Sequence, residues 1–163
     1  MQGIAKATLC SIFIALFLLV LSSFIYFFPW YTTLVVETFN VSQIVAGDNY
    51  LKESYYQEAL EHLNDTPLFD YYQSDSDKCV QITVKNESNR DAIGVDDETY
   101  YETMNEEQKP YGQRGRTLTV TIRATYPLKV RIMGNDYAAP ITLTCSLKTV
   151  GLKHYKDLEY YFD

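Results

Sequence analysis

The first 36 residues differ sharply in hydrophobic pattern from the rest of the chain. Residues 7–36 contain no charged side chain, and positions 7–25 are mostly apolar. A helix rises 1.5 Å per residue, so about 20 apolar residues cross the roughly 30 Å hydrocarbon core of a bilayer. The pattern therefore predicts a membrane-spanning helix, whose main lipid-contacting residues are Leu9, Ile12, Phe13, Leu16, Phe17, Leu19, Val20 and Ile25.

An aromatic cluster follows the apolar run. Amphipathic rings favour the headgroup level of a membrane, and Pro29 within the cluster is expected to kink or interrupt the helix because it lacks a backbone N–H. Lys6 precedes the run and Glu37 follows it, so the positive-inside rule predicts a cytoplasmic N-terminus and an extracytoplasmic segment 32–163. The predicted outer interfacial belt consists of Tyr26, Phe27, Phe28, Trp30 and Tyr31.

A cleaved signal peptide is the main alternative to an anchor, because it also combines a basic start with an apolar run. The apolar run here is longer than the roughly 7–15 residues of a typical signal core. Residues 22–28, Ser-Ser-Phe-Ile-Tyr-Phe-Phe, also lack a small-x-small cleavage site. These features favour a retained anchor, assigned to residues 1–31.

Residues 32–66 have the hydrophobic period of an amphipathic helix. Apolar residues recur every three or four positions, as at Val41, Ile44 and Val45. Residues 47–49, Gly-Asp-Asn, combine a left-handed-tolerant glycine with two candidate N-caps, which predicts a break or two helices. Residues 64–67, Asn-Asp-Thr-Pro, predict the end of the helical segment.

From residue 79 onward the hydrophobic period changes to two, which is typical of half-buried strands. The predicted fold class is therefore α+β, in which the transmembrane helix extends into an amphipathic helix that covers a small antiparallel sheet. A polar segment at about 85–116 is expected to form a long acidic loop within this sheet domain, residues 67–163. About four strands are predicted, at 79–84, 118–124, 128–132 and 141–147, the last two joined by a turn at 134–136.

The charge balance excludes one function class. Residues 37–163 carry 13 basic and 21 acidic residues, a net charge of −8. Nucleic-acid binding normally depends on a basic surface that releases phosphate counterions. We therefore expect no nucleic-acid partner.

Two cysteines lie on the predicted extracytoplasmic side, where disulfides form. Cys79 and Cys145 would close most of the sheet if they were bonded. However, Cys145 shares the apolar face of its predicted strand, whereas Cys79 falls on the polar face of its own strand. Both a disulfide and two unpaired side chains are therefore left open.

The sequence gives little support for catalysis or for a cofactor. His62 and His154 are the two imidazoles, and neither has neighbouring residues at metal-ligand spacing. No Gly-x-Ser-x-Gly elbow or catalytic-cysteine signature is present, so a non-enzymatic protein without cofactors is predicted. The acidic groups at 75–77 and 96–98 do not follow the spacing of a calcium-binding loop.

The chain resembles the TadE-like pseudopilins, a family of pilin-like membrane-anchored proteins. The resemblance is in the N-terminal anchor, the helical segment at 41–63, and the strand patterns Arg-Thr-Leu-Thr-Val-Thr-Ile at 116–122 and Ile-Thr-Leu-Thr-Cys-Ser-Leu at 141–147. It implies a structural or assembly role in a cell-surface filament, secretion or conjugation apparatus. Pilins usually carry Glu at the fifth mature position, whereas a cut after Gly3 places Thr8 there.

Two functions are therefore considered. In the first, the protein is a pilin-like assembly component whose partners are the lipid bilayer and other membrane or pilus-like subunits, including copies of itself. In the second, it is a membrane-anchored ligand-sensing or adhesive ectodomain that does not polymerise. An exposed apolar stripe continuing from the membrane helix would favour the first, and a deep apolar pocket would favour the second.

Overall fold

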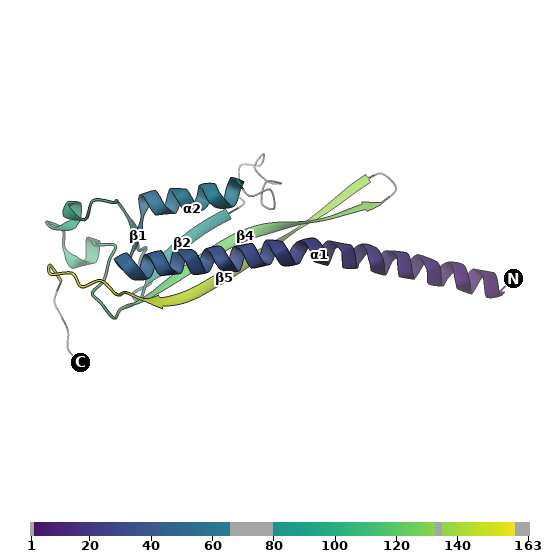
Figure 1. The fold of residues 1–163 in the computed structure, drawn as a ribbon, viewed down its shortest axis with the longest axis horizontal. Coiled ribbons are helices and arrows are strands. Elements are labelled where there is room, and N and C mark those ends of the chain that lie inside the picture. Colours follow the sequence, from purple (N-terminus) through teal and green to yellow (C-terminus); the bar gives the residue numbers. More distant parts are fainter. Residues whose placement is uncertain (1, 66–79, 133–134, 159–163) are drawn as a thin grey trace.

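The computed structural model describes residues 2–65, 80–132 and 135–158, and it is an α+β fold built on one very long helix. Figure 1 shows this helix running alongside the sheet and then continuing beyond it to the N-terminus. The elements, in chain order, are α1 (Gln2–Asp48), β1 (Leu51–Lys52), α2 (Glu53–Asp65), β2 (Val80–Asn86), β3 (Ile93–Gly94), the 3₁₀ turns η2 (Glu98–Tyr101) and η3 (Glu106–Gln108), β4 (Thr117–Ile132) and β5 (Asn135–Val150).

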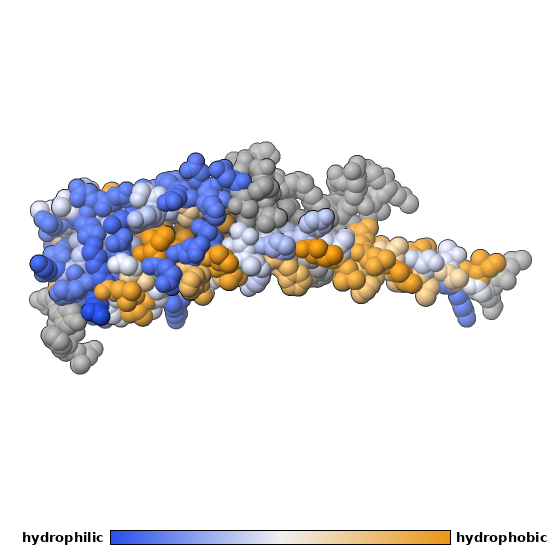
Figure 2. All heavy atoms as spheres, in the orientation of Figure 1, coloured by the Kyte–Doolittle hydropathy of each residue, from blue (hydrophilic) through white to orange (hydrophobic). Residues whose placement is uncertain are grey.

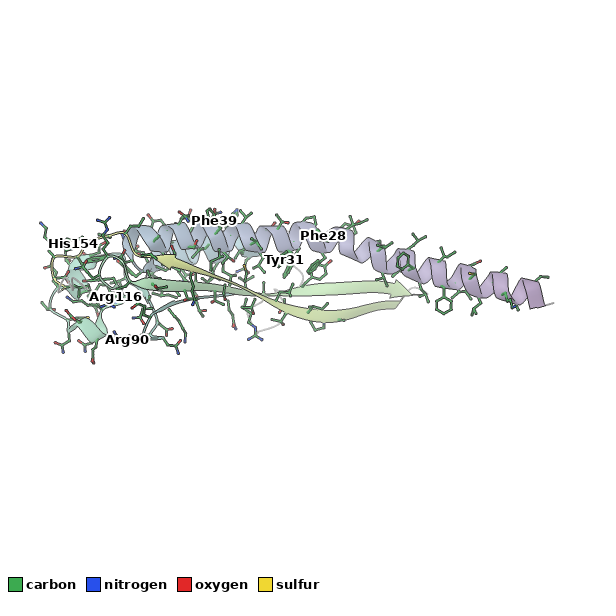
Figure 3. The ribbon with its side chains drawn as sticks, turned by 90° about the horizontal axis from the view of Figure 1, so that it is seen from below. Phe28, Tyr31, Phe39, Arg90, Arg116 and His154 are labelled. Atoms are coloured by element: carbon green, nitrogen blue, oxygen red, sulfur yellow. The ribbon has the colours of Figure 1, made fainter. Side chains whose placement is uncertain are left out.

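Helix α1 continues through Pro29, so the proline does not interrupt it. A proline inside a helix removes one backbone hydrogen bond and crowds the preceding turn, which commonly bends the axis. Figure 3 shows α1 changing direction near Phe28, beside this proline. The single helix therefore joins the apolar N-terminal stretch to the part that packs on the sheet.

The predicted break at 47–49 is confirmed as a division between two helices. Helix α1 ends at Asp48, and Asn49 adopts a left-handed conformation with φ of 61°. Asparagine tolerates this region better than most residues with a side chain. The chain then reverses direction through β1 and enters α2, which runs to Asp65. The predicted stop at 64–67 continues outside the described residues.

The main sheet has three antiparallel strands in the described residues, in the order β2-β4-β5, rather than about four. The strands predicted at 118–124 and 128–132 are one continuous strand, β4. Pro127 is accommodated because it pairs with Pro140 on edge strand β5, while the described residues of β2 pair with β4 only as far as Ala124. Its missing N–H therefore removes no bond that the described part of the sheet needs. Asn135 and Asp136, predicted in the turn, belong to β5.

The core lies between the sheet and the C-terminal half of α1. Alternate residues of β2, and of β4 as far as Tyr126, are buried, as the period-two pattern predicts, and they include Val84, Val120 and Ile122. They share one hydrophobic cluster with Trp30 and Leu34 of α1. A hydrophobic period of two buries one face of a strand, and a period of about 3.6 buries one face of a helix, so the two faces pack together.

The acidic segment between β2 and β4 contains short ordered elements. Strand β3 pairs in parallel with β1, and the loop places Tyr101 and Tyr111 in the core cluster. The Tyr101 hydroxyl also accepts a hydrogen bond from the Val95 backbone N–H at 2.7 Å. Aromatic anchors therefore hold a segment whose charged side chains are mainly in solvent.

Candidate functional site

The N-terminal half of α1 is long and apolar enough to cross a membrane, and none of its most apolar stretch is buried inside the protein. This exposure distinguishes it from the core helix of a globular domain, which buries its apolar side chains. Among the predicted span residues Leu19 is half-buried, and the exposed ones are Leu9, Ile12, Phe13, Leu16, Phe17, Val20 and Ile25.

The structure divides the aromatic belt into two groups. Tyr26, Phe28 and Tyr31 are exposed. Trp30 is fully buried, and its ring centroid lies 5.1 Å from that of Tyr126 on β4. Phe27 is partly buried and packs edge-on against the same tyrosine at 5.3 Å. Trp30 and Phe27 therefore join α1 to the sheet, a role that the sequence pattern did not predict.

An apolar stripe runs along α1 across the predicted membrane boundary. We define the outer stripe as Phe28, Val36 and Phe39, whose exposed fractions are 63%, 50% and 55%. Phe28 and Phe39 are eleven residues apart, which is about three helical turns, so they lie on the same side of α1. Figure 3 labels both along the helix, and Figure 2 shows apolar surface extending from the N-terminal half towards the body of the protein.

The C-terminal segment 151–158 docks on the end of α1 and on the acidic loop. Asn49 is almost fully buried, and its side-chain amide donates to the carbonyl oxygens of Gly112 and Lys153 at 2.9 and 2.6 Å. Its side-chain oxygen accepts from the Lys153 backbone N–H at 2.9 Å. The segment is thereby tied to two parts of the chain that are distant in sequence.

A second polar cluster holds the same segment. The Lys109 ammonium group, whose side chain is 3% exposed, lies 2.6 Å from the Asp157 carboxylate. The Tyr111 hydroxyl donates to the same carboxylate oxygen at 3.0 Å, and the Tyr111 ring stacks on Tyr155 at a centroid distance of 4.0 Å. A buried ammonium group needs this partner, because an unpaired charge in the interior is costly.

Acidification is expected to weaken this docking. Burial raises the pKa of Asp157, but hydrogen bonds from Lys109 and Tyr111 outweigh burial and hold its pKa below the ordinary value. A carboxyl group with a lower pKa in the folded state contributes stability above its unfolded pKa of about 4, and this contribution is lost as the pH falls through the folded value. Thermal unfolding of the full chain in detergent should therefore show a falling midpoint below about pH 4.

The control for this pH dependence is Asp157→Asn, which should have a flatter acid profile. Its unfolding midpoint should still fall somewhat with acidification, because the pKa of Glu87 is also lowered, mainly by a hydrogen bond from the Thr117 backbone N–H. An unchanged acid profile in Asp157→Asn would contradict the assignment to this carboxylate.

A surface pocket lies at the end of the molecule away from the N-terminus, lined in part by Arg90, Arg116 and Glu87. Both guanidinium groups already have partners: Arg90 donates to the Glu107 carbonyl oxygen at 2.6 Å, and Arg116 lies 3.2 Å from the Glu87 carboxylate. Figure 3 shows the two arginines close together near the domain end. The pocket is open and partly polar, unlike the deep apolar pocket expected of a small-molecule receptor.

The predicted cysteine pair is only partly covered by the structure. Cys145 is half-buried on β5, opposite Ile122, and Cys10 is exposed on α1. Cys79 lies outside the described residues, so its pairing with Cys145 stays a prediction. The histidines are apart: His62 lies 3.4 Å from Glu37, and His154 contacts Gln113 at 3.0 Å. The described part of the chain contains no group of three His, Cys, Asp or Glu side chains suited to a metal ion.

The chain is thus an α+β protein with one N-terminal helix long and apolar enough to cross a membrane. Comparison with protein-family models, with characterised proteins and with solved structures finds no match. The exposed apolar side of α1 is the feature that best separates the two candidate functions, because an exposed stripe favours assembly and a deep apolar pocket favours ligand sensing.

Proposed function

We propose that the protein is a single-pass membrane protein that acts as a non-enzymatic, pilin-like structural or assembly component. Helix α1 anchors it, the N-terminus faces the cytoplasm, and the α+β domain lies outside. Lys6 before the apolar run and Glu37 after it support this orientation through the positive-inside rule. The continuity of α1 from the apolar run into the core supports a retained anchor rather than a cleaved signal.

The outer stripe is the observation that carries the assembly role. Phe28, Val36 and Phe39 remain exposed while the opposite side of the same helix packs into the core. Val36 and Phe39 lie past the predicted anchor, residues 1–31, where lipid would not cover them. Contiguous exposed apolar surface on a soluble domain commonly marks a protein interface. A subunit packed along this side of α1 would bury surface both within the membrane and outside it.

Electron microscopy of the full-length protein, purified from membranes in mild detergent, tests the proposal. Periodic oligomers or filaments that are built on α1 are expected. Dispersed monomers at all concentrations would contradict the assembly role and favour a monomeric sensing or adhesive ectodomain.

A charge placed in the outer stripe should weaken assembly. Phe39→Glu is expected to raise the apparent dissociation constant of the oligomer at least tenfold, because a carboxylate would be buried at an apolar contact. Folding should be little affected, since Phe39 is 55% exposed. Sedimentation of the full chain in detergent micelles measures the populations of monomer and oligomer.

Gln43→Glu is the matched control, because Gln43 is an exposed polar residue one helical turn further along α1. It adds the same charge near the stripe without removing apolar surface, and glutamate has almost the same shape as glutamine. Equal weakening by the two variants would indicate a general charge effect and would contradict an interface centred on Phe39.

A further inference from the structure

The β4–β5 hairpin extends much further towards the N-terminal half of α1 than the core requires. Tyr126 of β4 packs against Phe27 of α1, which is two residues past the apolar run. Beyond the pair Tyr126↔Ile141, six more residue pairs continue to Ile132↔Asn135. At about 3.4 Å per residue, these pairs carry the strands roughly 20 Å further, equivalent to about 13 residues of helix.

The hairpin extends towards the apolar half of α1, which is the predicted membrane anchor. Figure 1 shows the hairpin reaching past the middle of α1, level with its apolar half. If residues 7–25 are held in a bilayer, the base of the hairpin lies at the membrane surface, because α1 fixes this base through Phe27 and Trp30, just past the apolar run.

We propose that residues 127–132 and 135–140 form a second membrane contact, which lies in an anionic headgroup layer beside the anchor. This inference rests on the proposed membrane anchor and adds a lipid-binding surface to it. The partner is the bilayer that holds α1, because the hairpin base and the end of the apolar run meet at Phe27.

The charge pattern of these residues fits an anionic surface. Leu128, Val130 and Ile132 alternate with Lys129 and Arg131 along β4. The whole segment 127–140 has two basic residues and one acidic residue, whereas the remainder of residues 37–163 has 11 basic and 20 acidic residues. The extended hairpin is thus net positive within a strongly acidic domain. Basic residues near an anionic leaflet are attracted, and apolar neighbours add interfacial burial.

The open edge of the sheet sets the depth of this contact. Strand β5 is an edge strand of the described sheet, so one side of it presents backbone groups without strand partners. Such groups are not tolerated in the hydrocarbon core, where water is absent, but they are hydrated among headgroups. A hairpin parallel to α1 would enter the hydrocarbon core, whereas Figure 1 shows the hairpin diverging from the apolar half of α1. We therefore place it along the interface.

Photo-crosslinking of the full chain in vesicles tests the contact. A benzophenone amino acid would replace Phe17, Val130 or Val150, one at a time, in protein reconstituted into phosphatidylcholine with anionic phosphatidylglycerol. Phe17 reports the anchor, and Val150 is the control because it lies at the opposite end of the hairpin, paired with Thr117. Lipid adducts, detected by mass spectrometry, are expected from positions 17 and 130 but not from 150.

The outcomes separate the two proposals. Lipid adducts from position 17 without any from 130 would overturn the hairpin contact and leave the anchor intact, as would crosslinks from 130 to a second copy of the chain alone. No lipid adduct from 17 would overturn the anchor and the hairpin contact with it. Replacing both Lys129 and Arg131 with Gln should reduce the adducts from 130 about tenfold in anionic vesicles and leave those from 17 unchanged.

Discussion

Replacing Trp30 with alanine is expected to lower the free energy of unfolding by about 3–5 kcal/mol, the range for truncating a large buried aromatic residue. Trp30 is 0% exposed and sits where α1 crosses β4, stacked at 6.1 Å on Phe27 and tilted at 5.1 Å against Tyr126. Its loss would leave a cavity at the joint between helix and sheet. Denaturant unfolding of the full chain in detergent, followed by circular dichroism, measures the change.

Phe28→Ala provides the matched control, because Phe28 is also aromatic and lies on the same turn region of α1 but is 63% exposed. It should change stability by less than about 0.5 kcal/mol, as surface substitutions usually do. A small effect of Trp30→Ala, comparable to that of Phe28→Ala, would mean that α1 does not pack on the sheet as described.

The elements of this fold were predictable wherever one hydrophobic period dominates. The alternation at 80–84 and 118–124 matches the buried residues of β2 and β4, and the break before Asn49 follows from local turn chemistry. The strand count was not predictable in the same way. Pro127 reads locally as a strand boundary, and only its pairing with Pro140 across the hairpin shows why β4 continues through it.

The candidate site was less predictable, because its key residues depend on distant partners. Trp30 belongs to an aromatic run typical of a membrane interface, and its burial depends on Tyr126, which is 96 positions later in the chain. Lys109 is part of a polar segment, yet its ammonium group is buried against Asp157. No local pattern indicates either contact. The exposed apolar side of α1, in contrast, follows directly from the uncharged run.

Asn49→Ala is expected to destabilise the protein by about 3 kcal/mol. Two contributions combine: alanine at φ of 61° costs roughly 1 kcal/mol, and its partners at Gly112 and Lys153 lose three hydrogen bonds to a side chain that is 1% exposed. The C-terminal segment should also become more sensitive to protease, since these bonds tie it to the end of α1. Denaturant unfolding and limited proteolysis of the full chain check the two effects.

Asn89 separates the two contributions, because it has nearly the same φ, 59°, but is exposed. Asn89→Ala should therefore cost only the backbone part, about 1 kcal/mol, and should leave the C-terminal segment protected. Asn49→Gly makes the complementary change, because glycine adopts this conformation freely but restores none of the hydrogen bonds. It should remain destabilised by about 2 kcal/mol. Equal losses for Asn49→Ala and Asn89→Ala would show that backbone conformation alone, and not the side-chain bonds to Gly112 and Lys153, accounts for the role of Asn49.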